Sequence, residues 1–199
     1  WYMYRQQFIF KPFHNLIIKK LEDIVFGRAK KRNLVLNMPP RFGKSAICQM
    51  ACAWSYMINP HSNCIYTSYS DDLTSAFSKD IRSIIESEAF KELTGVKLNK
   101  AKSGADYWAT TLGGGFRAAS MGGAITGFGA GVSGDEFGGF LIIDDPNKAS
   151  NVKSQAEMQN TIDYYNNTLK SRCNNQARTP IILIMQRLSI DDLTGFVLE

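Results

Sequence analysis

The sequence has few of the features that mark membrane-spanning, secreted or metal-stabilised proteins. It contains no run of about 18 apolar residues, and its N-terminus does not resemble a secretory signal peptide. The four cysteines include no Cys-x-x-Cys pair, and the two histidines are too few to complete a structural metal site with them. We therefore expect no membrane contact, and cysteines that serve as small buried apolar residues in a reducing compartment.

The composition is typical of a soluble globular protein. Of the 199 residues, 44% are hydrophobic and 21% are charged, which allows one sizeable domain with its own core. The formal net charge of +5 is compatible with a polyanionic partner, although many soluble proteins carry as much charge. The chain starts with Trp1 rather than methionine, so we expect it to be a piece of a longer protein.

Segments with helical and with strand-like patterns alternate along the chain. Helices are predicted at 12–27, 44–58, 70–87, 154–171 and from 189 onward. Strands are predicted at 33–38, 63–69, 106–111, 115–118, 140–146 and 180–185. Because the longer strands are apolar throughout, the pattern predicts an α/β fold, a three-layer sandwich with a mostly parallel central sheet. No internal repeat or domain boundary is visible.

Two segments are expected to lie outside the core. Residues 122–139 are rich in glycine, which predicts a mobile loop. Arg28, Lys30, Lys31 and Arg32 form a basic cluster that is either a solvated connector or a contact for a polyanion.

The stretch MPPRFGKSAIC, residues 38–48, ends like a phosphate-binding loop but lacks the first glycine of the usual pattern, whose place Met38 takes. Gly43 permits a close backbone approach, Lys44 can reach the β- and γ-phosphates of a nucleotide, and Ser45 can bind Mg²⁺. A buried strand is predicted before this loop and a helix after it, which is the context that such a loop requires.

The stretch FLIIDDP, residues 140–146, adds two carboxylates to the same edge of the predicted sheet. Its apolar residues predict a buried strand that ends at Asp144 and Asp145, and ligands of open α/β sheets bind at the carboxyl ends of the strands. Asp144 is placed to hold Mg²⁺, and Asp145 to polarise an attacking water as in additional-strand P-loop ATPases. The alternative is an ordinary strand exit with turn residues.

These features together resemble one protein family, the large terminase subunit of tailed bacteriophages. The resemblance covers nearly the whole chain, in family order, and concerns the N-terminal ATPase part of that subunit. It rests on the stretches FKPFHNLIIKKLEDI, NLVLNMPPRFGKS, CIYTSYSDDLTSAFSKDIRSII, AITGFGAG, FLIIDDPNKAS and IILIMQRLSIDDLTG. Loops of this family often lack the first glycine, which accounts for Met38.

The resemblance implies a fold, an activity and partners. The fold would be that of a P-loop NTPase of the ASCE/RecA-like type, with residues 1–199 forming the ATPase domain. The activity would be Mg²⁺-dependent ATP hydrolysis that drives double-stranded DNA into a procapsid, in the cytoplasm of the bacterial host. The partners would be DNA, the portal protein, the small terminase subunit and neighbouring copies in a ring. The RNase H-like nuclease domain of the family does not fit into this chain, so we expect no DNA cleavage by it.

The resemblance also assigns roles to individual residues. Lys44 is the loop lysine, Ser45 and Asp144 are the Mg²⁺ ligands, and Asp145 is the catalytic carboxylate in a place where many relatives have glutamate. Arg41 matches an arginine that the family keeps inside the loop to reach the γ-phosphate. The expected nucleotide-binding segment comprises Pro39, Pro40, Arg41, Phe42, Gly43, Lys44, Ser45 and Ala46.

Other assignments leave alternatives open. His14 either takes the place of the adenine-reading glutamine of relatives or is a helix-start histidine without a partner. Gln186 follows the last predicted strand, where the family has its coupling motif, and is a candidate γ-phosphate sensor although relatives have Thr-Arg there. Asp191 and Asp192 belong to the same motif or are helix-start acids. The arginine finger supplied in trans is assigned to Arg117, with Arg178 and Arg187 as competitors.

Two other functions fit the same residues. One is a fragment of another nucleic-acid-dependent ATPase or helicase, which would need a second RecA-like domain. The other is a nucleotide-binding prophage remnant that no longer hydrolyses ATP, against which the presence of Lys44, Ser45 and Asp144 argues. A small-molecule kinase would need a lid for its acceptor, and no such pattern follows the loop.

Overall fold

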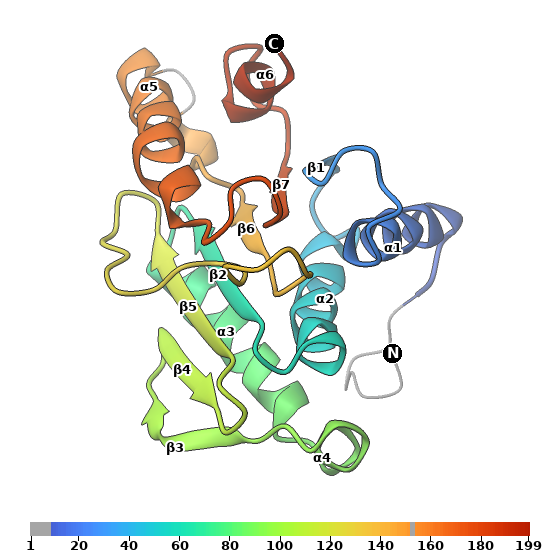
Figure 1. Ribbon diagram of the computed structural model, residues 1–199. Coiled ribbons are helices and arrows are strands. Elements are labelled where there is room, and N and C mark those ends of the chain that lie inside the picture. Colours follow the sequence, from blue (N-terminus) through green and yellow to red (C-terminus); the bar gives the residue numbers. More distant parts are fainter. Residues whose placement is uncertain (1–8, 152–153) are drawn as a thin grey trace.

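A seven-stranded sheet forms the centre of the molecule (Figure 1). The computed structural model describes residues 9–151 and 154–199. The strands lie in the order β1-β7-β6-β2-β5-β4-β3. Their bounds are Leu34–Asn37 for β1, Asn63–Ser68 for β2, Leu98–Ser103 for β3, Tyr107–Thr110 for β4, Gly115–Ser120 for β5, Leu141–Asp144 for β6 and Ile181–Met185 for β7.

Most of the sheet is parallel, as the sequence predicts. Strands β1, β7, β6, β2 and β5 pair in parallel, whereas β4 and β3 are added antiparallel at one end. Strand β7 comes last in the chain but lies between β1 and β6. The carboxyl ends of β1 and β6 therefore flank the end of β7 at one edge of the sheet, which brings residues 38–46 and 144–145 into the same region.

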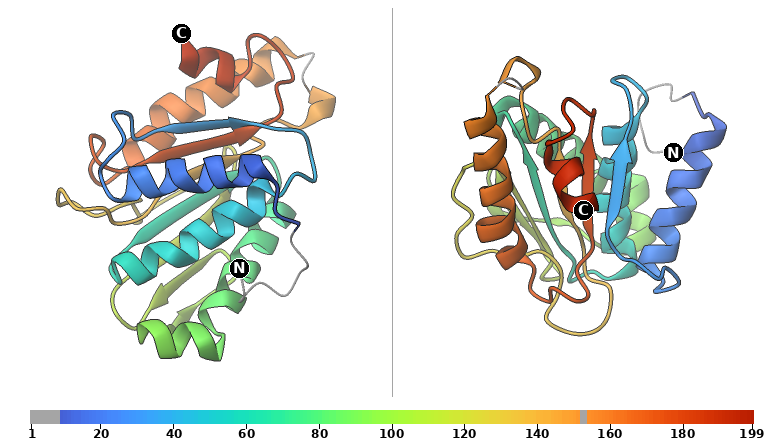
Figure 2. Two further views of the ribbon diagram at one scale, coloured as in Figure 1. Left: turned by 90° about the vertical axis from the view of Figure 1, so that its right-hand side faces the viewer. Right: turned by 90° about the horizontal axis from the view of Figure 1, so that it is seen from above.

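Helices cover both faces of the sheet, so the predicted three-layer α/β arrangement is confirmed. One core joins the sheet to α1 and α2, which run side by side in Figure 2, and to α3 and α4; the other joins it to α5 and α6. Alternation along β7 serves both cores, because Ile182 and Ile184 face the first and Leu183 and Met185 the second. The helix bounds are Pro12–Val25 for α1, Lys44–Ile58 for α2, Asp71–Ile85 for α3, Glu88–Thr94 for α4, Gln155–Tyr164 for α5 and Leu193–Leu198 for α6.

Several predicted elements differ from the observed ones. The helix predicted at 154–171 ends as α5 at Tyr164 and continues as a π-helical turn, Tyr165–Leu169, and a 3₁₀ turn, Lys170–Arg172. Another 3₁₀ turn covers Ala149–Asn151. The strand predicted at 33–38 is β1, which lies at an edge of the sheet, so that only Leu36 is buried.

Sequence reasoning missed α4 and β3. Helix α4 has local signals, since the Ser87 hydroxyl accepts a hydrogen bond from the Phe90 amide and Gly95 ends the helix at a φ of 70°. Strand β3 has little local signal, because asparagine, lysine and alanine are poor strand formers. It forms through its pairing with β4, and its exposed lysines suit an edge strand.

The glycine-rich segment is an irregular loop, as predicted, but it is part of the packed structure, so the prediction that it lies outside the core was wrong. Ile125, Ala130 and Phe140 are almost completely buried. The amide of Gly131 donates to the Asn63 carbonyl at 2.8 Å, and the Asn63 amide donates to the Gly138 carbonyl at 2.8 Å. The glycines allow this close approach to the start of β2. A Cβ atom on Gly139 would overlap the carbonyl oxygen of Asn63.

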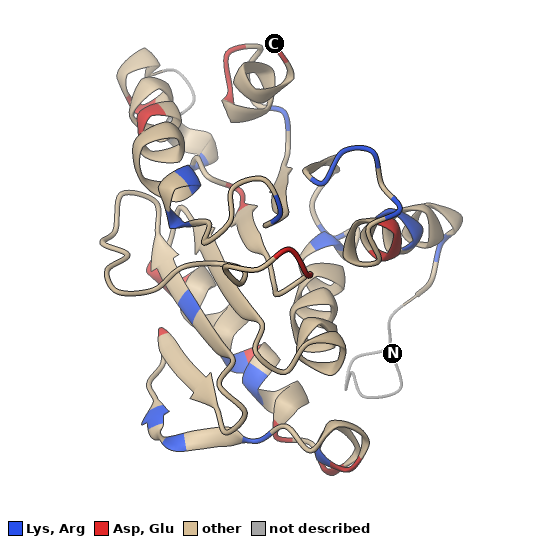
Figure 3. Ribbon diagram, viewed as in Figure 1, with Lys and Arg blue, Asp and Glu red and all other residues tan. Residues whose placement is uncertain are grey.

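The basic cluster lies in the segment that joins α1 to β1, where Figure 3 shows most of the connecting loop in blue. Arg28 pairs with Asp23 at 2.8 Å, and Asp23 also pairs with Lys19 at 2.8 Å. Lys30 and Lys31 are exposed, and no ion pair is formed by them among the described residues. This geometry is compatible with both alternatives, a solvated connector and a polyanion contact.

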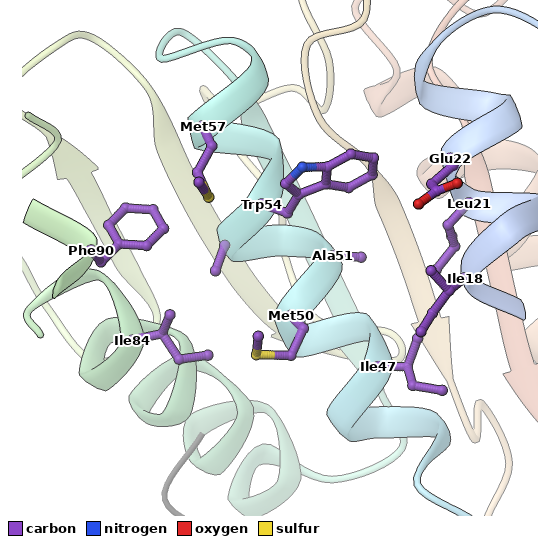
Figure 4. Close-up of a pocket in the computed structure, with 11 residues that line it drawn as sticks. Ile18, Leu21, Glu22, Ile47, Met50, Ala51, Trp54, Met57, Ile84 and Phe90 are labelled. Carbon is purple, nitrogen blue, oxygen red and sulfur yellow. The ribbon is translucent and has the colours of Figure 1, made fainter. Parts of the chain in front are cut away.

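An apolar cavity of about 270 Å³ lies between α1, α2, α3 and α4. In Figure 4, Ile18 and Leu21 of α1 face Ile47 of α2, while Met50 and Met57 face the side of α3 and α4. The cavity contains none of the predicted site residues.

The cysteines have the buried environment that the sequence predicts. Cys48, Cys52, Cys64 and Cys173 are all buried and unbridged, as expected. Within the described ranges, no helix is both long and apolar enough to cross a membrane.

We expect Gly139→Ala to lower the free energy of unfolding by about 3 kcal/mol or more, because the φ of +117° and the Asn63 carbonyl both oppose a side chain. The matched control is Gly122→Ala, which has a φ of +85° but open space around its Cβ, and should cost only about 1 kcal/mol. Urea unfolding of both variants measures the difference. Equal losses would contradict the observed packing of the segment.

Candidate functional site

The loop between β1 and α2 has an unusual backbone. Its base is fixed where the Met38 amide donates to the Met185 carbonyl of β7 at 3.3 Å. Arg41 has a φ of 64° and Gly43 a φ of 77°, both in the left-handed region. Pro39, Pro40, Arg41 and Phe42 are exposed, while Ala46 is half-buried in the first turn of α2. The loop thus presents its backbone at the start of a helix, where amide groups point toward a bound anion.

Lys44 is the first residue of α2, and its side chain is buried. Its ammonium group donates to the Met38 carbonyl at 3.2 Å and lies 3.6 Å from Oδ1 of Asp145. The ammonium group therefore lies beneath the loop and beside a carboxylate. This position sets a positive charge next to the backbone amides of the loop.

Ser45 and Asp144 meet although they are 99 residues apart in the chain. The Ser45 hydroxyl donates to Oδ2 of Asp144 at 2.7 Å, and the Tyr66 hydroxyl donates to the same oxygen at 3.1 Å. Oδ1 of Asp144 is buried and has no hydrogen-bond partner among the described residues. Burial raises the pKa of the Asp144 carboxyl above its ordinary value, against the hydrogen bond from Ser45, and the neighbouring Asp145 raises it further.

Asp145 has a φ of 43°, so that Arg41 and Asp145 are the non-glycine residues of the described chain with a positive φ. Its amide donates to the Ile184 carbonyl at 2.7 Å, and its Oδ1 accepts from the Gln186 amide at 3.3 Å. The side chain is 32% exposed, in contrast to the buried Asp144. Left-handed backbone at a non-glycine residue costs about 1–3 kcal/mol and occurs most often at functional sites.

His14 is buried at the start of α1 and contacts the loop. Its Nδ1 accepts from the Lys11 amide at 2.9 Å, so Nε2 carries the proton and donates to the Phe42 carbonyl at 2.9 Å. The alternative of a helix-start histidine without a partner is therefore wrong. Both ring nitrogens bind backbone in this structure, and the adenine-reading role stays a prediction.

The segment after β7 is organised around Asp192, whose side chain is completely buried. Its carboxylate accepts from Arg187 Nε and the Leu188 amide, each at 3.0 Å, and from the Gly195 amide at 2.9 Å as the N-cap of α6. Burial opposes the charge, but the hydrogen bonds from Gly195 and Leu188 outweigh it and lower the pKa of Asp192. Asp191 is exposed beside it. Asp192 thus has the role of a helix-start acid, one of the two roles that the sequence left open, and it also binds Arg187.

The structure places the three competing arginines differently. Arg117 is half-buried in β5, and its Nε has no hydrogen-bond partner among the described residues. Arg178 pairs with Asp135 at 3.0 Å, and Arg187 is held by Asp192.

The donors present fit Mg²⁺. A serine hydroxyl and a carboxylate with a buried, unpaired oxygen are hard oxygen ligands, and Mg²⁺ in nucleotide sites takes few protein ligands beside phosphate oxygens and water. Within residues 9–151 and 154–199, no group of three or more His, Cys, Asp and Glu side chains could form a metal cage.

Two contributors to the site were missed by sequence reasoning. Tyr66 binds Asp144 from β2, and Asn37 at the end of β1 binds Thr194 of α6 at 3.0 Å. Both are polar groups at positions within or at the end of apolar strands, and that is the signal which could have indicated them.

Comparison with known proteins bears on the fold of the chain. No protein-family model matches the sequence, and no curated protein matches it. Among solved structures, the crystal structure of the HK97 bacteriophage large terminase matches with a TM-score of 0.62 and 14% sequence identity. This chain has the fold of a bacteriophage large terminase. The match covers 96% of this chain and 36% of the terminase chain, so the chain spans about a third of that protein.

The terminase match bears on the fold and not on the chemistry, because 14% identity does not carry residue roles. It agrees with the α/β class that the alternation of helices and strands predicts. The coverage corresponds to one part of a longer terminase, as the resemblance in the sequence implies.

We expect Asp144→Asn to raise the free energy of unfolding at pH 7 by on the order of 1 kcal/mol, because the buried ionised carboxylate has an unpaired oxygen. A carboxyl whose pKa is raised in the folded state stabilises the protein below its ordinary pKa, and this contribution is lost as the pH rises through the folded pKa. The gain from asparagine should therefore vanish in acid. Thermal unfolding from pH 7 downward measures this, with the exposed Glu86→Gln as control; a loss of stability at pH 7 would contradict it.

Proposed function

We propose that this chain is the ATPase domain of a viral DNA-packaging motor, which couples Mg²⁺-dependent ATP hydrolysis to the movement of double-stranded DNA into a procapsid. The observation that carries the proposal is the meeting of Lys44 and Ser45 with Asp144 and Asp145 at one edge of the sheet. The four side chains come from segments about a hundred residues apart, on the fold of a large terminase.

The geometry supports a division of work between the two carboxylates. Asp144 and Ser45 would hold Mg²⁺, which when bound neutralises phosphate charge and fixes the β- and γ-phosphates. Lys44 would contact the same phosphates from beneath the loop. Asp145 is more exposed than Asp144, and its position beside Lys44 suits a carboxylate that orients and polarises the attacking water.

Two further residues are proposed to act at the γ-phosphate. Arg41 lies exposed in the loop, and its backbone is in a strained conformation. Its guanidinium group forms no ion pair among the described residues. Gln186 follows β7, and its backbone amide donates a hydrogen bond to the Asp145 side chain. This position suits a sensor that links the γ-phosphate to the turn after β7. His14 holds the loop to α1 through the Phe42 carbonyl, and we propose that it lies beside the adenine base of the bound nucleotide.

The proposed partners are those that the resemblance to the terminase family implies, and the shared fold supports that resemblance. They are double-stranded DNA, the portal protein, the small terminase subunit and neighbouring copies of the chain in a ring, in the cytoplasm of a bacterial host.

Two alternatives remain distinguishable. A helicase-type ATPase would unwind a duplex when joined to a second RecA-like domain, whereas the packaging motor moves intact duplex. A nucleotide-binding remnant would bind Mg²⁺-ATP without releasing phosphate.

We expect phosphate release to fall about 100-fold or more in Lys44→Ala and in Asp145→Ala, because each removes a group aimed at the reacting phosphate. Asp145→Ala should keep its affinity for Mg²⁺-ATP, since the loop, Ser45 and Asp144 remain. The assay uses the full-length protein or the chain with its neighbouring subunits, with and without DNA. Absence of phosphate release by the unmodified protein under these conditions would refute the hydrolysis.

The trans arginine can be tested by mixing subunits. We expect Arg117→Ala alone and Lys44→Ala alone to be inactive, and an equal mixture to recover part of the activity, because a Lys44→Ala neighbour would supply Arg117 to an intact loop. Arg178→Ala serves as the matched control at an arginine that is already ion-paired. Full hydrolysis by Arg117→Ala alone would remove Arg117 from the site.

A further inference from the structure

Asn37 occupies a branching point in the hydrogen-bond network. It is the last residue of β1, directly before the loop, and its side-chain amide donates to the Met185 carbonyl at 3.3 Å and to the Thr194 hydroxyl at 3.0 Å. Thr194 is completely buried in the first turn of α6. The next residue, Met38, donates its amide to Met185 and accepts from Lys44 through its carbonyl. One amide side chain thus joins the base of the loop, the end of β7 and α6.

Several hydrogen bonds cross-link the turn between β7 and α6. Asp192 accepts hydrogen bonds from both sides of the turn, and Arg187 donates to the Ser189 carbonyl at 3.0 Å and the Ile190 carbonyl at 3.2 Å. Gly195 closes the turn, because a Cβ atom there would overlap the Ile190 carbonyl oxygen. At its other end the turn begins at Gln186, whose amide binds Asp145.

These contacts form a closed circuit around the candidate site. It runs from Asp145 through Gln186 and the Asp192 turn to Thr194, then through Asn37 and Met38 to Lys44, which lies beside Asp145. If a bound phosphate displaces the loop or Asp145, the displacement can reach α6 through a few hydrogen-bonded groups rather than through the apolar core.

We infer that Asn37 and Thr194 are positioning residues that couple α6 to the nucleotide loop, so that α6 changes its stability when the loop binds phosphate. This inference rests on the proposed function for its ligand. It assigns the output of the site to α6, and it gives Asp192 the task of keeping the turn rigid.

Hydrogen exchange of the α6 amides tests the coupling directly. The 199-residue chain is compared with and without Mg²⁺ and a non-hydrolysable ATP analogue, whose binding is measured in parallel by calorimetry. We expect exchange in residues 193–198 to change about threefold or more on binding in the unmodified chain. Asn37→Ala and Thr194→Val should bind the analogue within about twofold of the unmodified affinity, while most of the α6 response is lost.

Matched variants separate coupling from simple loss of a hydrogen bond. Thr194→Ser keeps the hydroxyl and should restore the α6 response. Thr94→Val removes a threonine hydroxyl that binds the Phe90 carbonyl and the Val96 amide at the end of α4, and should leave the response unchanged. In the hydrolysis assay, Asn37→Ala and Thr194→Val should lower kcat about tenfold with KM within about twofold, and the double variant should lose no more than either single one.

The outcomes distinguish this inference from the proposed function. If the unmodified chain does not bind the analogue, the proposed function and the inference both fail. If it binds but α6 does not respond, or if Thr194→Val responds like the unmodified chain, the coupling through Asn37 and Thr194 is refuted while the proposed function stands.

Discussion

The hydrogen bond from Ser45 to Asp144 is the contact on which the arrangement of the candidate site depends. It joins the first turn of α2 to the end of β6, two segments that the parallel strands β1, β7 and β6 bring to the same edge of the sheet. The cost is a buried carboxylate with an oxygen that has no partner among the described residues. A group that is unfavourable for stability is kept here by the core around it, and it is the group to which we assign the Mg²⁺ in the proposed function.

Backbone strain is concentrated at the same edge. Arg41 and Asp145 both have left-handed backbone; Arg41 lies in the loop before Lys44, and Asp145 lies beside the buried ammonium group of Lys44. Neighbouring strands hold these conformations, since the Asp145 amide binds Ile184 and the Met38 amide binds Met185 on β7. The position of β7 between β1 and β6 thus supports both halves of the site, and the turn that follows β7 is hydrogen-bonded to Asp145.

Local patterns indicated much of the fold. A strand that is buried on both faces is apolar throughout, and a helix that is buried on one face repeats its apolar residues about every 3.6 positions. These patterns located the strands FLIID and IILIM and the helix that starts at Lys44 close to their observed bounds. The glycine-rich segment was placed outside the core because glycine is common both in exposed loops and where backbone segments pack closely. Only the contacts of Ala130, Gly131 and Gly138 with their neighbours tell the two apart. Strand β3 was missed because its pairing with β4, and not its composition, makes it a strand.

By itself the sequence determined the chemical groups available, a loop ending in Lys44-Ser45 and a strand ending in Asp144-Asp145, together with the α/β class in which such segments occur. The tertiary structure decided which of these groups meet, because the strand order brings together side chains that are about a hundred positions apart. It also decided the partners of His14, Arg187 and Asp192, since hydrogen bonds to backbone groups leave no periodic trace in a sequence. The periodicity of a sequence reflects which residues are buried, whereas a functional site depends on which distant residues come within contact distance of one another.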